Sequence, residues 1–543
     1  MRASRVGHAR LSLLAVLVVV AAVMLSAPAL APALGAPVRG GRLVVGKPLD
    51  PDGYDPHRVT AINAAYVISL IYDTLLHLDY DLKTITPGLA RSWDVSRDGL
   101  TYTFELRNDV RFHSGRRFTS ADVKYTFERL LEPRTASPHR FRLGAVERIE
   151  TPSETTVVLR LREPQTDLLL QLTIPFLGII DREAVERFGD RYGSAGAGGT
   201  GPFVFVEWVP NDRTVLRRND AYRWGPQYYR NRGPAHVDEV VYRTIPETQT
   251  LIFELERGNV HSGFGVRPPD IDVLRRNRDV QILEAKPYQH IQYLSFKITR
   301  PNLGDVRVRK AISAAINKAE LVKDVQRGQG AVAHGIVQPS TLDYWAGQEQ
   351  VFPRYDPGQA RALLEEAGWR PGPDGIRTRD GQRLQLQFFG ISASQEELAT
   401  LLQAHLKAVG IDMQIRLVTL SAYFPGLRNQ DYDVWSLDYP YASILEMLNL
   451  YFWSGNIPSP NRVMWDDRRT DGLLLVARRA RTDEQRVRAV HDLQKVVAEN
   501  HLWVPLWHRV LLVPTRVEVR GFRPHGVYGQ AYYKLLDVWL ERR

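Results

Sequence analysis

The spacing of apolar residues changes near Tyr293, and this change limits the folds that the chain can adopt. Upstream, apolar residues alternate with polar ones, as in LTYTFELR at residues 100–107, which is typical of strands with one buried face. Downstream, apolar stripes with helical spacing alternate with short strands, and this order predicts an α/β region with a largely parallel sheet. Because 543 residues are too many for one hydrophobic core, we expect two or three domains.

Capping residues mark the ends of several predicted helices. Thr119 and Asp122 have the spacing of a capping box and predict a helix over residues 118–131 that lies on the upstream sheet. Asp305 is expected to open a single helix over residues 306–322. The other helices are predicted from Asp356-Pro357 to Gly368, from Ser394 to Gly410 and over residues 483–499, and strands are predicted at residues 384–389, 411–418 and 502–514.

Residues 1–36 have the composition of a secretory signal peptide. Three arginines near the start precede an apolar run at residues 11–25, and small residues follow in APALAPALGA. The apolar run is too short for a stable membrane span, and no later segment is apolar enough for one. We therefore expect a periplasmic or extracytoplasmic protein that is not integral to the membrane. Because the chain has no cysteine, we expect neither disulfides nor a thiol-linked lipid anchor.

The charge pattern argues against a nucleic-acid partner. The formal net charge falls from +10 to +7 when the three arginines of the predicted signal peptide leave with it. The remaining basic residues are scattered, and no run of five or six cations occurs. A nucleic-acid surface is therefore not expected.

The glycine-rich stretch GSAGAGGTGPFVFVEW at residues 193–208 contains the spacing G-x-G-x-x-G at Gly196, Gly198 and Gly201. In a dinucleotide-binding loop this spacing is followed by a helix whose N-terminus binds the phosphates. Here Pro202 and a strand-like run of valines and aromatic residues follow instead. We therefore interpret the stretch as a flexible crossing between structural units.

No common catalytic or metal-binding motif is complete. In the tract DPDGYD at residues 50–55, the glycine comes two places too early for a calcium loop, and position twelve is Ala61 instead of glutamate. The 14 histidines are dispersed, and no serine lies in G-x-S-x-G. We expect no catalytic residue, no metal site and no cofactor. An exported hydrolase with an unrecognised pair of carboxylates stays open as an alternative, because any two of the 61 acidic residues could meet in the fold.

Aromatic residues crowd one downstream tract that includes Trp435, Tyr439 and Tyr441 and also carries Asp438. Two interpretations are open. The tract is either part of a sheet-and-helix core, or it forms the flat walls of a ligand cleft in which a charge orients a small molecule. The second interpretation makes these four residues candidate ligand-binding residues.

Six tracts, in order from about residue 54 to residue 522, share the pattern of one family. The tracts are YDPHRVTAINAAYVISLIYDTLLHLD, PGLARSWDVSRDGLTYTFELRNDVRFHSGRRFTSADVKYTFERL, GTGPFVFVEWVPNDRTVLRRNDAY, DVRVRKAISAAINKAELV, YDPGQARALLEEAGW and HLWVPLWHRV. Together they resemble the dipeptide/oligopeptide-type (family 5) extracellular solute-binding proteins of ABC importers.

The resemblance implies an α/β, two-lobed, periplasmic-binding-protein-like fold of type II, in the large cluster C form with an extra N-terminal subdomain. Lobe I is expected to combine residues 37–79, 199–289 and 504–543. The additional subdomain is expected at residues 80–198, and lobe II at residues 290–503. The implied mechanism is that a monomer closes over a solute and docks on an ABC permease that works with its ATPase.

The resemblance also suggests ligand-binding positions. In peptide-binding members, an aspartate in the tract W-x-x-D-Y pairs with the α-ammonium of the peptide, and Asp438 holds that place in WSLDY. A second register, anchored on the upstream Y-D-V, puts Ala442 there instead, and the D/E-P that follows in the family is absent. The other matching positions are the segment from Thr60 to Ile62, His139 or Phe141 in the lining loop TASPHRF, and Phe264, which neighbours the His261 that replaces a family acidic residue.

The implied function is capture of a peptide or a peptide-sized solute. Other solutes, namely an oligosaccharide, an opine or a metal complex, stay open as alternatives.

Overall fold

The computed structural model describes residues 36–543 except 287, 393, 442, 527–532 and 543. The predicted signal peptide therefore lies almost entirely outside the described residues. Residues 39–543 form one compact unit, and all that follows concerns this unit. Within the described part of the chain, no helix combines the length and the hydrophobicity that a membrane span requires.

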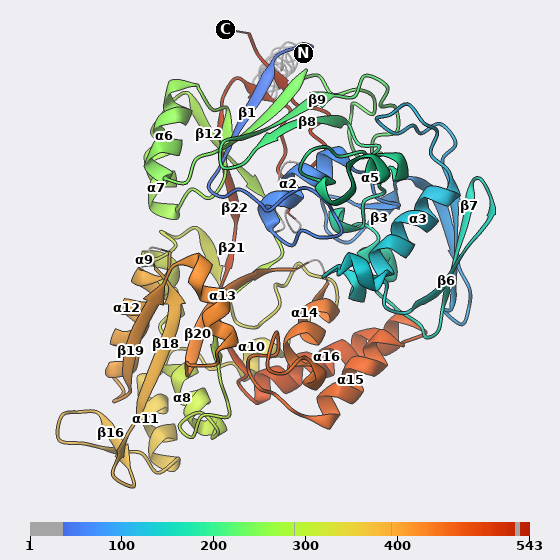
Figure 1. Cartoon of the computed structure of the whole chain (residues 1–543). Helices are drawn as coiled ribbons and strands as arrows, with labels where there is room; N and C mark the ends of the chain where they lie inside the picture. Colours follow the sequence, from blue (N-terminus) through green and yellow to red (C-terminus); the bar gives the residue numbers. More distant parts are fainter. Residues whose placement is uncertain (1–35, 287, 393, 442, 527–532, 543) are drawn as a thin grey trace, which may run out of the picture. The chain divides into compact units, whose positions relative to one another are not determined.

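A seven-stranded mixed sheet collects strands from distant parts of the chain (Figure 1). Strand β1 runs parallel to its two neighbours, β10 and β11, and the remaining pairs in the sheet are antiparallel. Helix α2 (Ile62–Ile71) contacts this sheet at β8, while α6 (Thr248–Arg257) and α7 (Pro268–Leu274) contact β11 and β12. The strand order is β12 (Val280–Ala285), β22 (Leu511–Arg516), β11 (Ser262–Gly263), β1 (Arg42–Lys47), β10 (Glu239–Thr244), β9 (Arg213–Arg218) and β8 (Phe203–Val209).

A six-stranded sheet forms the centre of the downstream half. Its order is β14 (Gly330–Val332), β21 (Trp503–Arg509), β13 (His290–Phe296), β20 (Val434–Pro440), β18 (Gln385–Ile391) and β19 (Asp412–Val418). Only the pairs β18–β19 and β18–β20 are parallel, so the prediction of a largely parallel sheet is wrong. The reason is that β13 enters from the seven-stranded sheet and β21 returns to it, so these two neighbours run in opposite directions.

Two chain crossings connect the two sheets. The first lies between Ala285, where β12 ends, and His290, where β13 begins. The second leads from β21 to β22 at Val510 (Figure 1). The predicted single strand over residues 502–514 is therefore two strands, which belong to different sheets. Local alternation cannot reveal this break, because both halves of the segment have the residue pattern of strands.

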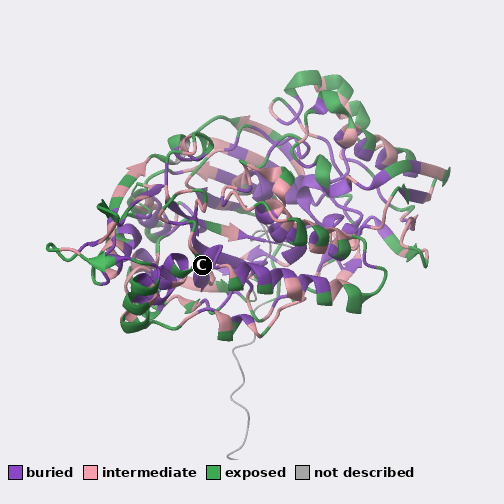
Figure 2. Cartoon of the chain, turned by 90° about the horizontal axis from the view of Figure 1, so that it is seen from below, coloured by how far each residue is buried: buried purple, intermediate pink, exposed green. Residues whose placement is uncertain are grey.

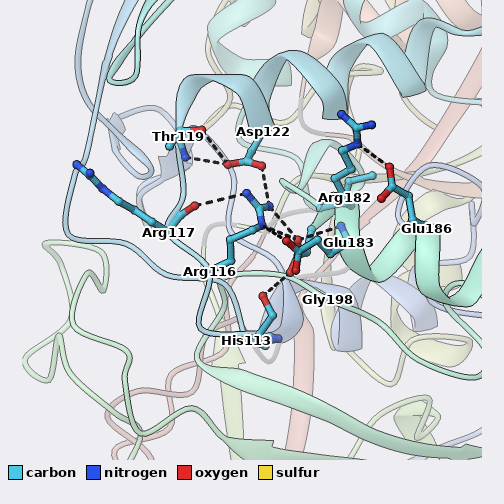
Figure 3. Close-up of polar contacts among 12 residues, drawn as sticks. His113, Arg116, Arg117, Thr119, Asp122, Arg182, Glu183, Glu186 and Gly198 are labelled. Atoms are coloured by element: carbon cyan, nitrogen blue, oxygen red, sulfur yellow. Dashed lines mark hydrogen bonds and ion pairs between the residues drawn. The ribbon is translucent and has the colours of Figure 1, made fainter.

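A four-stranded antiparallel sheet lies between β1 and β8 in the sequence and carries helix α3 (Ser120–Leu131). The predicted capping box is confirmed, since the Thr119 amide donates to the Asp122 carboxylate at 2.8 Å. Arg116 donates to Asp122 at 2.7 Å and to Asp181 at 2.8 Å, and Asp181 is the N-cap of α5 (Arg182–Phe188) (Figure 3). One arginine thus joins the beginnings of two helices. The strands are β4 (Ala90–Val95), β5 (Thr101–Leu106), β7 (Thr156–Leu161) and β6 (Val146–Ser153).

Helices cover both faces of the six-stranded sheet. One face packs on α8 (Val306–Ala315), α11 (Pro357–Glu366) and α12 (Glu396–Lys407), and the other on α14 (Ile444–Phe452), α15 (Arg468–Arg478) and α16 (Asp483–Glu499). The alternation along β13 explains this, because Ile291 and Tyr293 belong to one hydrophobic cluster and Leu294 and Phe296 to the other. Figure 2 colours the chain by burial and shows exposed residues mainly at the outside and buried residues in the interior.

Most helix boundaries agree with the predictions, and two differ. The predicted single helix over residues 306–322 is interrupted after Ala315, and α9 (Lys318–Asp324) begins anew because the Asn317 side chain accepts from the backbone N–H of Glu320. Helix α12 follows Gln395, so Ser394 is not its N-cap. The capping aspartates Asp305 and Asp356 and the boundaries of α16 are confirmed.

The glycine-rich stretch is closely packed rather than a flexible linker, so that interpretation is wrong. A Cβ atom on Gly201 would lie 2.3 Å from the carbonyl oxygen of Leu70, and one on Gly199 would lie 2.3 Å from that of Ile71. Both carbonyls belong to the last turn of α2, so these glycines let the chain pass against the helix. The strand β8, and not a helix, follows the stretch, which confirms that it does not have the architecture of a dinucleotide-binding loop.

The remaining elements are short. They are β2 (Leu76–Leu78), β3 (Ile85–Pro87), α4 (Leu168–Gln171), α10 (Gln348–Val351), β15 (Arg370–Pro371), β16 (Arg377–Arg379), β17 (Gln382–Arg383), α13 (Leu420–Arg428), β23 (Val519–Arg520) and β24 (Trp539–Leu540), with 3-10 turns at Pro133–Thr135, Arg140–Leu143, Pro175–Leu177, Gly189–Arg191 and Ser454–Asn456.

Candidate functional site

Asp438 lies on β20 near the point where the chain crosses between the two sheets. Its side chain is 46% exposed, and its Oδ2 atom lies 3.3 Å from Nε2 of His290 and 3.3 Å from Nη1 of Arg509. His290 is the first residue of β13, and Arg509 is the last residue of β21. Both partners of this carboxylate are therefore attached to the two chain crossings.

The surroundings of Asp438 keep it ionised. The His290 ring is fully buried and stacks on Tyr288, with ring centroids 5.6 Å apart, and burial lowers the pKa of His290. A neutral His290 donates from Nε2 to the carboxylate. Burial by itself would raise the pKa of Asp438, but this hydrogen bond and the charge of Arg509 lower it well below its usual range. A carboxylate thus faces solvent beside one cation.

The three aromatic candidates next to Asp438 lie in different environments. Trp435 is buried in the core and packs edge-on against Tyr432, with ring centroids 4.9 Å apart. Tyr441 is also buried, and its hydroxyl accepts from the backbone N–H of Gln338 at 3.1 Å. Tyr439 is only partly buried and contacts Tyr451 edge-on at 5.1 Å. The core interpretation therefore describes Trp435 and Tyr441, whereas Tyr439 and Asp438 are partly accessible to solvent.

The candidates from the upstream half gather around the beginning of α2. Nε2 of His139 lies 2.7 Å from the carbonyl oxygen of Val59, directly before Thr60, and the His139 ring stacks on Phe176 at 4.2 Å. Burial lowers the pKa of His139 to about 3, so the ring is neutral and donates from Nε2. Phe264 contacts Tyr66 of α2 with ring centroids 4.2 Å apart. Thr60 is exposed, and Ile62 is the first residue of the helix.

Phe141 is 46% exposed and lines a cavity that the sequence did not predict. A buried ion pair between Arg142 and Glu446 lies at this cavity, with Nη1 and Oε2 2.9 Å apart and side chains 5% and 8% exposed. Arg142 directly follows the predicted Phe141, and Glu446 lies in the aromatic tract, but nothing local indicates that residues 304 positions apart meet. The other lining residues are Gln165, Asp167, Gln171, Leu445, Asn449, Leu450, Asn456 and Arg478.

Side chains that could bind a metal ion do not cluster in the described residues. No group of three or more His, Cys, Asp or Glu side chains among them has a geometry that could hold one. Polar and aromatic side chains instead lie at a cavity and near the crossings between the two sheets. Such linings are typical of sites that bind a small molecule non-covalently.

Comparisons with known proteins also indicate a protein that binds a solute. The family model for bacterial extracellular solute-binding proteins, family 5, matches residues 84–458, which is more than half of the chain. A protein of Pseudomonas aeruginosa, named probable di/tripeptide-binding protein 5, is 28% identical over 523 residues, covering 90% of this chain and 94% of its own. The glutathione-binding protein GsiB of Salmonella paratyphi A is 26% identical over 478 residues, covering 86% of this chain and 89% of its own.

A solved structure extends the similarity to three dimensions. The ABC transporter-associated periplasmic binding protein DppA from Helicobacter pylori, in complex with the peptide STSA, has a TM-score of 0.79 and 26% identity, covering 93% of this chain and 99% of its own. The predicted fold class, a cluster C periplasmic binding protein, is therefore confirmed. The matching proteins bind solutes and are not enzymes, so the alternative of an exported hydrolase is wrong. This chain belongs to family 5 of the bacterial extracellular solute-binding proteins, the solute-binding components of ABC transporters.

Proposed function

We propose that this protein captures a peptide or a peptide-sized solute between two lobes and delivers it to a membrane permease. Two sheets joined by two chain crossings carry this proposal, because a pair of crossings allows two bodies to rotate as a hinge. Lobe I comprises residues 37–79, 199–289 and 510–543, with the subdomain at residues 80–198, and lobe II comprises residues 290–509. The expected boundary at residue 504 moves to Val510 because β21 (Trp503–Arg509) pairs with β13 and β14 in the six-stranded sheet. We place the hinge at the two crossings, one between β12 and β13 and the other at Val510.

The names of the relatives support a peptide as the solute. Similar proteins are named for di- and tripeptides and for glutathione, which is itself a modified tripeptide, and the DppA structure contains a peptide. Asp438 is our candidate partner for the α-ammonium of the solute, because it is ionised and half-exposed. The ammonium would share the carboxylate with Arg509. Thr60, Ile62, His139, Phe141, Phe264 and the tract of Trp435, Tyr439 and Tyr441 are proposed to surround the remainder.

Closure of the lobes is the step that couples capture to transport. A solute that contacts both lobes stabilises the closed form, and the permease with its ATPase would recognise that form. We propose that the protein acts outside the cytoplasm as a monomer after its signal peptide is removed. These statements rest on the family and on the composition of residues 1–36.

Calorimetric titration of the purified protein tests the proposal. The probes are dialanine, trialanine, glutathione and an oligosaccharide of similar mass, and we expect at least one of the three peptides to bind with micromolar or tighter affinity, about −8 kcal/mol. The same sample should become more compact in solution scattering. Tight binding of the oligosaccharide alone, or co-purification of a non-peptide ligand, would refute a peptide solute. Asp438→Ala should weaken peptide binding more than tenfold, and an unchanged affinity would reject its role.

A further inference from the structure

The cavity beside Phe141 contains more hydrogen-bond acceptors than the protein satisfies. We infer that this cavity, lined by Gln165, Asp167 and Asn449, is a subsite for a cationic amine of the solute, such as the ammonium group of a lysine side chain. The inference rests on the proposed function as a peptide-binding protein, and it specifies which side chains the solute carries.

Two buried carbonyl oxygens at the cavity have no partner in the described structure. Gln165 is only 5% exposed, and its amide nitrogen donates to the carbonyl oxygen of Arg142 at 2.9 Å and to Asp167 at 3.3 Å. Because both of these partners are acceptors, the amide orientation is fixed and Oε1 is the atom left over. Oδ1 of Asn449, which also lines the cavity, is likewise buried without a partner. Buried acceptors of this kind need a donor.

Asp167 adds a negative charge to the same cavity. Its carboxylate accepts from the amide nitrogen of Gln171 at 2.8 Å and from that of Gln165 at 3.3 Å. Among the described residues, no cation lies within ion-pair distance of it. Burial raises the pKa of Asp167, and the neighbouring charge of Glu446 acts in the same direction. A cationic group would offset the cost of burying this carboxylate.

The two arginines of the cavity do not fill this role. Arg142 is engaged by Glu446 at 2.9 Å and by Gln171 Oε1 at 2.6 Å, so its charge is already compensated. Arg478, which also lines the cavity, lowers the pKa of Asp167 through its charge, but the two form no ion pair among the described contacts. The lining therefore offers two carbonyl oxygens without a donor, and one carboxylate that accepts hydrogen bonds but has no ion-pair partner among the described residues. Together they match the three donors and the charge of an ammonium group.

The cavity also joins two segments that are far apart in the sequence. The Thr166 amide donates to the carbonyl oxygen of Arg478 at 3.1 Å, and its hydroxyl donates to that of Ala477 at 3.0 Å. One wall of the cavity belongs to the proposed subdomain at residues 80–198, and the other belongs to proposed lobe II. A cation bound there would contact both walls, so it would favour their association.

Matched tripeptides test the subsite. The probes are Lys-Ala-Ala, Ala-Lys-Ala and Ala-Ala-Lys, each compared by calorimetry with the same peptide that carries norleucine in place of lysine. Norleucine retains the aliphatic chain and lacks the ammonium group. We expect at least one lysine peptide to bind tenfold or more tightly than its norleucine partner. Equal or weaker binding of all lysine peptides would overturn the inference and leave the proposed function intact. Failure of every tripeptide, of dialanine and of glutathione to bind would refute both.

Substitutions at the cavity provide the second test. In Asp167→Asn, which retains the shape of the side chain, the affinity ratio of lysine to norleucine peptide should fall below about twofold. Asn449→Ala should lower the ratio as well, and it serves as the second variant if Asp167→Asn does not fold. Asp94→Asn, at an exposed position on β4, is the matched control and should retain the ratio. A ratio that survives in both cavity variants would overturn the inference.

Discussion

The buried ion pair between Arg142 and Glu446 allows a quantitative prediction. Both side chains are almost fully excluded from solvent, at 5% and 8% exposure, and their charged atoms are 2.9 Å apart. Removing one partner from such a pair costs about 3 kcal/mol, because the other charge stays buried and uncompensated. The compact unit has about 500 residues, so its unfolding entropy near 60 °C is about 1 kcal/mol per kelvin if it melts cooperatively. Glu446→Leu and Arg142→Met should therefore each lower the melting temperature by about 3 °C.

A double-mutant cycle separates the pair from other effects of these substitutions. In the variant with both changes, no charge is buried alone. We therefore expect it to regain at least half of the melting temperature that the single variants lose. The control is Lys124→Met, which removes the exposed pair with Glu128, at 39% and 53% exposure, and should change the melting temperature by less than 1 °C. Differential scanning calorimetry measures all four variants. Strictly additive losses, or single variants that melt like the wild type, would refute the idea that this pair is desolvated and coupled.

Three further predictions concern stability. Gly201→Ala should abolish soluble expression or lower the melting temperature by several degrees, since its Cβ would lie 2.3 Å from a backbone carbonyl oxygen. The control, Gly472→Ala, has open space around the new Cβ and should leave the melting temperature unchanged. Similar behaviour of the two variants would contradict the packing argument. Arg116→Ala should lower the melting temperature by about 2 °C, because two capping aspartates lose a charge-assisted hydrogen bond, and an unchanged melting curve would show that the caps do not need it. Burial lowers the pKa of His77 and of His139 to about 3. Between about pH 6.5 and pH 3 the folded protein therefore binds fewer protons than the unfolded chain. The free energy of unfolding should keep its full value above about pH 6.5 and fall below that pH, by up to about 1.4 kcal/mol per pH unit for each histidine. Thermal melts at pH 7.5 and pH 5 test this, and equal melting temperatures would refute it.

Local features of the sequence predicted the elements whose causes are local. The capping box of Thr119 and Asp122 needs only residues three apart, and the structure contains it. The helix over Asp483–Glu499 and the strand over Thr101–Leu106 follow from their own periodicity. The break at Asn317 could also have been read locally, since asparagine is a good N-cap, but the apolar stripe on both sides of it suggested one helix.

The site was predicted less completely, because its contacts depend on pairs of distant residues. Asp438 was a candidate from its tract alone, whereas its partners Arg509 and His290 come from strands that only the sheet brings together. The cavity of Asp167 and Asn449 has no sequence signature, since each wall taken alone is an ordinary polar helix or loop.

The sequence by itself determined the α/β class, the caps at Thr119, Asp305 and Asp356, the absence of cysteine chemistry and the family, because these depend on residue identity and short-range spacing. Only the tertiary structure decided the strand directions in the six-stranded sheet, the break of one apolar segment into β21 and β22, and the close packing of Gly201 on α2. It also decided which charges are buried together. The physical reason is that burial and pairing are properties of neighbours in space, and those neighbours here are separated by up to several hundred residues.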